Sequence, residues 1–135
     1  MTLDDLICKM ECQDLILRHA RHLDAGELAE SRTVYTHDAI IVGPTGQEIR
    51  QADIPDERLK QVTANLRPRI VTNIMVTPTS LTTAKAFAYV TLPRAEIPQG
   101  EWHYDLCKLD QGWRISRFGA VGIERDKGGA GNKSG

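Results

Sequence analysis

The sequence has no concentration of positive charge. Its 135 residues carry a formal net charge of −1, and no block of Lys or Arg is longer than a dipeptide. Proteins that bind nucleic acids neutralise phosphates with clustered basic side chains, so we expect no nucleic-acid partner.

Long hydrophobic runs are also missing. No apolar stretch approaches the roughly 20 residues that a helix needs to cross a bilayer. The first residues, MTLDDLICK, are acidic where a signal peptide would be basic. We therefore expect a cytoplasmic protein with no membrane attachment.

Cysteines are few and are not paired in sequence. Cys8, Cys12 and Cys107 are an odd number and lack the paired spacing of a zinc site. We expect them to be reduced and structural. Nothing in the sequence calls for a metal or another cofactor.

The composition is that of an ordinary globular domain, with 41% apolar and 26% charged residues. The helical patterns come first and the strand patterns follow. Helices are expected over residues 3–23, 25–35 and 53–65. Strands are expected over residues 39–43, 47–50, 69–76, 82–92, 101–109 and 113–123. This order predicts one α+β domain over residues 1–126, with helices on one face of a curved antiparallel sheet, and a flexible Gly-rich tail over residues 127–135.

The end of the first helix, LRHARHLDAGE, holds two histidines and an aspartate. At about 100° per residue, Leu6, Met10, Leu17 and Ala20 form one apolar side, and Asp24 falls within about 20° of its middle. Asp24 either ends the helix and caps the following turn, or turns into the space between helix and sheet. In that space, burial would favour the protonated acid and make the carboxyl a proton carrier near neutral pH.

The two histidines point elsewhere. His22 lies on the solvent-exposed face of the helix, and His19 lies at the flank of that face beside the two cysteines. Both directions differ from that of Asp24 by about 100° or more, so the three side chains do not converge on a metal ion. We interpret both histidines as polar side chains on the surface of the helix, with no catalytic or metal-binding role.

The strands show which side chains face the core. In EWHYDLCKL, alternation places Trp102, Tyr104 and Leu106 inside and His103 on the outer face. In RIVTNIMV both alternating sets are partly apolar, and Phe118 is opposite in phase to Trp113. A sheet covered on both sides fits these patterns, so we expect a homodimer through the outer sheet face.

Four segments together resemble a known family: HARHLDAGE, VYTHDAIIVGPTG, RIVTNIMV and LCKLDQGWRISRFG. In this order they resemble the SnoaL-like polyketide cyclase and scytalone dehydratase branch of the nuclear transport factor two-like superfamily, over residues 5–122. The resemblance implies a cone-shaped half-barrel, in which three helices and a curved sheet enclose a pocket. It also implies that Asp24 reaches into that pocket, and that Arg69 replaces the catalytic histidine of the dehydratases.

This resemblance suggests a lyase, isomerase or cyclase that acts on a small apolar cyclic or polyketide-like molecule. Asp24 would abstract a proton next to a carbonyl, and Arg69 would stabilise the enolate oxygen. Asn73 and Tyr104 would orient the substrate by hydrogen bonds. We expect Tyr104, together with Asp24 and Arg69, to be a catalytic residue, and Asn73 to be a substrate-binding residue. Trp102 and Phe118 would form the apolar wall.

The arginine keeps a second hypothesis open. If Arg69 and Asp24 lie within about 4 to 6 Å, the cation would hold the carboxylate ionised. Asp24 is then either a base or half of a buried ion pair that shapes the pocket. In the second case the chain would be a non-catalytic small-molecule-binding protein or the small subunit of a ring-hydroxylating oxygenase.

Overall fold

The computed structural model describes residues 1–95 and 98–122, so the predicted tail over residues 127–135 lies outside the described residues. The helices are α1 (Leu3–Ala25), α2 (Leu28–Thr33), the 3-10 helix η1 (Gln51–Asp53) and α3 (Asp56–Leu66). The strands are β1 (Tyr35–Val42), β2 (Glu48–Arg50), β3 (Ile70–Pro78), β4 (Thr83–Thr91), β5 (Gln99–Leu109) and β6 (Gly112–Gly122). No described helix has the length and apolar character required to cross a membrane.

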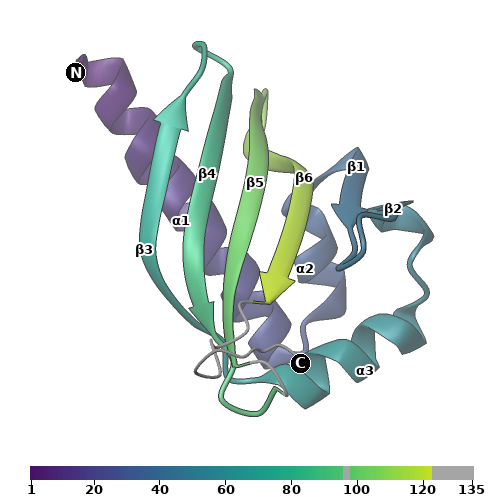
Figure 1. The fold of residues 1–135 in the computed structure, drawn as a ribbon. Helices are drawn as coiled ribbons and strands as arrows, with labels where there is room; N and C mark the ends of the chain where they lie inside the picture. The colour runs from purple at the N-terminus through teal and green to yellow at the C-terminus, as the bar shows by residue number, and fades with distance from the viewer. Residues whose placement is uncertain (96–97, 123–135) are drawn as a thin grey trace.

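The six strands form one open sheet in the order β2-β1-β6-β5-β4-β3. Helix α1 crosses one face of this sheet behind β3, β4 and β5, while the opposite face carries no helix (Figure 1). The predicted α+β class is therefore confirmed. All neighbouring strands are antiparallel except β1 and β6, which pair in parallel. The predicted antiparallel sheet is therefore mixed at this one pair. The pair joins β1, which precedes α3, to the last strand of the chain, and no local pattern indicates such a contact.

Helix α1 is capped at both ends. Thr2 and Asp5 form a capping box, in which each side chain bonds to the backbone N–H of the other residue. Gly26 closes the helix in the left-handed conformation, with φ of 69°. Helix α2 is shorter than predicted. Tyr35 belongs to β1, because the Ile115 N–H donates to the Val34 carbonyl and draws this segment toward the sheet.

The predicted apolar side of α1 is wrong. Leu6, Met10 and Leu17 are 45%, 65% and 50% exposed. The buried residues follow the neighbouring stripe of Cys8, Cys12, Leu15, Ile16, His19 and Ala20. The sheet fills the interface with Trp102, Tyr104, Leu106 and Trp113, all buried in the same core cluster. Because the large side chains of this interface come from the sheet, several of the side chains that the helix contributes are small. Small side chains do not stand out in a hydrophobicity pattern, so the buried stripe was not recognised.

Two irregularities reset the alternation of the strands. The β3–β4 register shifts between Thr72 and Met75, and Asn73 has φ of 56°. The β5–β6 register shifts at Ser116, between the partners Ile115 and Arg117. These are β-bulges, which bend a strand and change the face of the residues that follow.

The bulges correct the prediction that β3 and β6 are each apolar on both faces. On either side of the β3 bulge, Val71 and Val76 both pack in the core. On either side of the β6 bulge, Trp113 and Phe118 do the same. The apparent opposite phases of these buried residues therefore arise from one inserted residue in each strand.

Candidate functional site

The centre of the molecule holds a buried histidine between two tyrosines. His19 extends from α1 and is fully buried. Its Nδ1 lies 3.0 Å from the Tyr104 hydroxyl on β5, and its Nε2 lies 2.7 Å from the Tyr35 hydroxyl on β1. The interpretation of His19 as a polar surface side chain is therefore wrong. His22 is partly exposed and pairs with Glu27 at 3.0 Å, as a surface histidine would.

Aromatic rings surround His19. The ring centroid of Phe118 lies 4.9 Å from that of His19, and the centroid of Trp102 lies 5.5 Å from it. Trp102 and Tyr104 are buried on the inward face of β5, as the alternation predicted. The structure thus brings together Trp102, Tyr104 and Phe118, three of the residues selected from the sequence, around a histidine that was not selected.

Burial determines the protonation of this group. Burial is the main cause, and together with the nearby Arg69 cation it lowers the pKa of His19 from 6.5 to about 3. Burial also raises the pKa of both Tyr35 and Tyr104 above the ordinary value. All three side chains are therefore neutral near pH 7. A neutral imidazole has one N–H and one acceptor nitrogen, so one hydroxyl donates to His19 and the other accepts from it.

Asp24 and Arg69 form an ion pair beside this centre. The Arg69 Nη1 donates to Asp24 Oδ1 at 2.7 Å, and the Arg69 backbone N–H donates to Asp24 Oδ2 at 3.1 Å. The Arg69 side chain is 3% exposed and the Asp24 side chain is 27% exposed. Asp24 thus accepts two bonds from Arg69 and lies at the edge of the core.

Asn73 and His103 lie outside this centre. Asn73 is exposed at the β3 bulge, where the change of register removes it from the face that its spacing predicted. His103 is exposed on the outer sheet face and pairs with Glu101 at 3.0 Å, as the two-residue period predicted. Asn73 is therefore not among the side chains around His19.

His19 and Tyr35 are the residues that sequence reasoning missed. A signal for His19 was present, because it lies seven residues after Cys12 and eleven after Cys8, on the same helical stripe. Tyr35 had no such signal, since its role depends on where β1 joins the sheet.

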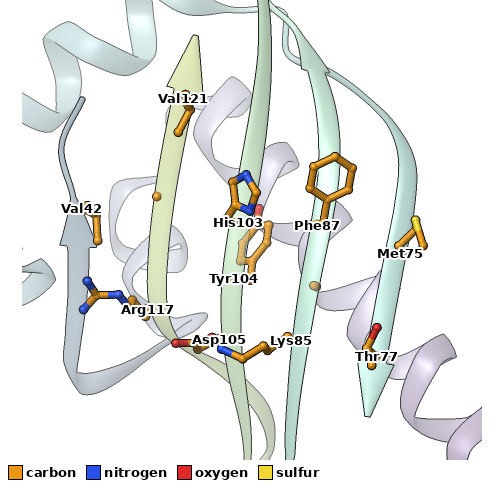
Figure 2. A pocket seen from close by; sticks show the side chains of 12 residues that line it. Val42, Met75, Thr77, Lys85, Phe87, His103, Tyr104, Asp105, Arg117 and Val121 are labelled. Atoms are coloured by element: carbon orange, nitrogen blue, oxygen red, sulfur yellow. Dashed lines mark hydrogen bonds and ion pairs between the residues drawn. The ribbon is translucent and has the colours of Figure 1, made fainter. Parts of the chain in front are cut away.

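One hollow lies on the outer sheet face, opposite α1, with a volume of about 610 Å³. Figure 2 shows Met75, Phe87 and His103 on the open side of the strands. The ion pair of Lys85 and Asp105, 2.8 Å apart, lies along its border. This hollow combines apolar side chains with a charged rim.

A second hollow, of about 660 Å³, lies among α2, β1, η1 and the start of α3. Its wall includes Arg32, whose guanidinium donates to the carbonyls of Gln51 at 3.0 Å and Ile54 at 2.7 Å. Tyr35 belongs both to this wall and to the hydrogen-bonded group around His19. Tyr35 and His37 both line the hollow. Among residues 1–95 and 98–122, no three His, Cys, Asp or Glu side chains gather in a way that could hold a metal ion.

Solved structures share this fold at low identity. A candidate scytalone dehydratase from Novosphingobium aromaticivorans is 17% identical, with a TM-score of 0.73, over 97% of this chain and 100% of that chain. A candidate dehydratase of the NTF2-like family from Streptomyces avermitilis is 12% identical, with a TM-score of 0.73, over 88% of this chain and 98% of that chain. A candidate aromatic ring hydroxylase from N. aromaticivorans is 17% identical, with a TM-score of 0.67, over 93% of each chain.

No curated protein matches the sequence. The SnoaL-like domain, in contrast, matches residues 5–119, which include all but the first two residues of α1, the whole buried centre and all but the last residues of β6. The chain therefore belongs to the SnoaL-like domain family.

Proposed function

We propose that this protein is a lyase or isomerase that transfers a proton on a small, largely apolar carbonyl compound, of cyclic or polyketide-like type. The observation that carries the proposal is the ion pair of Asp24 with Arg69 beside the aromatic side chains that surround His19. Family membership and the dehydratase-named structural relatives support the reaction class.

The two side chains have complementary roles in such a reaction. The Asp24 carboxylate would take a proton from the carbon next to the carbonyl, and the electron pair would move to the carbonyl oxygen as an enolate. Each carboxylate oxygen accepts one bond from Arg69 and keeps a lone pair for this step. Among the described residues, Arg69 gives Asp24 one guanidinium bond, and its other N–H groups would stabilise the enolate oxygen.

The enolate then has two outcomes. If a carbon–carbon double bond is conjugated with the enolate, return of the proton from Asp24 to the far carbon of that system gives isomerisation. If the carbon β to the carbonyl carries a hydroxyl group, the enolate expels it and the protonated Asp24 gives its proton to that oxygen, so that water leaves in a lyase reaction. The aromatic side chains Trp102 and Phe118 would supply an apolar wall for the substrate.

The test follows exchange of carbon-bound hydrogen with solvent deuterium, which does not require the natural substrate. The probe is 2-tetralone in D₂O, observed by NMR with wild-type protein, Asp24→Asn and Asp14→Asn. We expect Asp24→Asn to reduce the protein-dependent exchange rate by about 10²- to 10⁴-fold, while affinity changes less than about tenfold. Asp14, an exposed acid on α1 paired with Arg18, is the matched control and should leave the rate unchanged.

Unchanged exchange in Asp24→Asn would contradict the proposal. A joint loss of affinity and folding stability would instead show that Asp24 supports the site without acting as a base.

A second candidate is a non-catalytic small-molecule-binding protein or the small subunit of a ring-hydroxylating oxygenase. It is favoured by the occupation of both Asp24 oxygens by Arg69, and by the hollow on the outer sheet face, which offers a docking surface. The structural relative named as an aromatic ring hydroxylase is consistent with it. This alternative predicts 2-tetralone binding without any protein-dependent exchange.

A further inference from the structure

Two of the three cysteines form a close pair away from the site described above. Cys8 and Cys12 lie one turn apart on α1, and their Sγ atoms are 4.0 Å from each other. Both are free thiols, and both belong to the core cluster between α1 and the sheet. Cys12 is 0% exposed and Cys8 is 8% exposed. Two thiols, the ligands that soft metal ions prefer, therefore lie together away from bulk water.

The helix prevents these two thiols from joining each other. Residues four apart on a helix have Cβ atoms about 5 to 6 Å apart, whereas a disulfide needs about 3.5 to 4.5 Å. A bond between Cys8 and Cys12 would therefore distort α1 in the middle of its first half. Burial, together with the neighbouring Cys8, also raises the pKa of the Cys12 thiol, so the reactive thiolate is scarce. Both sulfurs are thus kept as potential ligands.

The distance between the sulfurs suits one bridging ion. Two metal–sulfur bonds of about 2.3 Å each span at most about 4.6 Å between their sulfur atoms. The observed separation of 4.0 Å lies within this limit, so an ion fits between Cys8 and Cys12 after small side-chain rotations.

The number of ligands selects the kind of ion. A structural Zn²⁺ takes four protein ligands. Among residues 1–95 and 98–122, no third His, Cys, Asp or Glu side chain joins the cysteine pair to make a larger ligand group. Cu(I) is a soft ion for which thiolates are selective, and it forms stable complexes with two sulfurs alone. The pair therefore fits Cu(I) and does not fit Zn²⁺.

Acidic side chains lie where the pair approaches the surface. Cys8 lines a hollow of about 190 Å³ between the first turns of α1 and the turn that joins β3 to β4. Its wall also includes Asp4, Asp5 and Glu11, against a single basic side chain among the described residues, Lys108. An excess of negative charge raises the local concentration of cations. A cation is therefore attracted to the side of the helix on which Cys8 lies.

We propose that Cys8 and Cys12 form a two-coordinate site for Cu(I) on the buried face of α1. The ion replaces the thiol protons and binds both Sγ atoms, with no change in the oxidation state of copper or sulfur. Because protons are released, the apparent affinity rises with pH. The site is separate from the proposed proton transfer, since Asp24 lies roughly 18 Å further along the helix than Cys12.

The test is anaerobic competition with bicinchoninate, a chelator whose Cu(I) complex is coloured, with ascorbate as the reductant. The complex is titrated with wild type, Cys8→Ala, Cys12→Ala and Cys107→Ala. We expect the wild type to take one Cu(I) per chain. Either helix variant should bind it more than about 100-fold more weakly, because loss of even an outer partner of a metal site costs about 10- to 100-fold. Cys107→Ala, altered at the remaining cysteine on β5, should bind Cu(I) like the wild type.

X-ray absorption of the wild-type complex gives a readout that does not depend on the folding of any variant. We expect two sulfur neighbours of copper and no further ligand, and an excess of Zn²⁺ should not displace the ion. No transfer of Cu(I) from the chelator, unchanged binding in Cys8→Ala or Cys12→Ala, a third ligand, displacement by Zn²⁺, or an affinity independent of pH would each overturn the inference. Asp24→Asn should bind Cu(I) like the wild type, so failure of the proposed proton transfer would be seen separately.

Discussion

The burial of His19 leads to a specific prediction of acid lability. In the folded protein its pKa falls from 6.5 to about 3, because the imidazole is removed from water and lies near the Arg69 cation. In the unfolded chain His19 takes up a proton at its ordinary pKa. Between these two values the unfolded state binds more protons than the folded state. The free energy of unfolding must therefore fall as the pH falls from 6.5 toward 3.

The size of this effect follows from the shift. Each pH unit within the window removes about 1.4 kcal/mol, so this one residue removes about 2 kcal/mol by pH 5 and about 5 kcal/mol over the whole window. Above pH 6.5 its full contribution is present. A loss of this size is a large fraction of the roughly 5 to 15 kcal/mol that stabilises a typical domain.

Urea unfolding at a series of pH values between 7.5 and 4.5 tests this prediction. The variant His19→Gln retains one donor and one acceptor for the two tyrosines but does not titrate. We expect the wild type to lose about 2 kcal/mol relative to this variant by pH 5. The control His103→Gln alters a histidine whose side chain is 51% exposed, and should keep the wild-type profile. Parallel pH profiles for wild type and His19→Gln would refute the reasoning.

Three further predictions concern other parts of the structure. Arg69→Met should lower the free energy of unfolding by about 3 kcal/mol, because it leaves the partly buried Asp24 carboxylate without its cation. Adding Asp24→Asn to this variant should restore part of the loss, and urea unfolding measures both effects. Asn73→Gly should preserve stability while Asn73→Ala lowers it by about 1 kcal/mol, because φ of 56° suits glycine and strains alanine; equal stability of the two variants would contradict a strained bulge. We also propose that the outer sheet face joins two copies of the chain, so light scattering should show a dimer at micromolar concentration and a monomer for Met75→Glu, altered at a 65% exposed position.

Much of the fold could be predicted from local sequence signals. The capping box at Thr2 and Asp5 marks the start of α1, and the alternation in Gln99–Leu109 assigns the inward face of β5. These signals depend only on neighbouring residues. The family resemblance then supplied the overall architecture, which no local pattern contains.

The site was predictable only in part, because it depends on contacts between distant segments. The sequence analysis had raised the pairing of Asp24 with Arg69 as one of the open alternatives, and the structure contains this pair. His19 was misjudged because cysteines and a histidine form the buried stripe of α1, while Leu6 and Leu17 are exposed. Asn73 was misplaced because a bulge reverses the alternation of β3, and a bulge leaves no reliable mark in a single sequence.

The parallel pairing of β1 with β6 also orders the events of biosynthesis. Residues Ile40 and Ile41 on β1 align with Arg117 and Phe118 on β6, so the second and third strands of the sheet pair only when the last strand arrives. On the ribosome, the early strand leaves the exit tunnel with an open apolar edge and must wait for its neighbour. Closure between such distant segments is slow, and the unpaired edge of β1 is exposed to aggregation until it occurs.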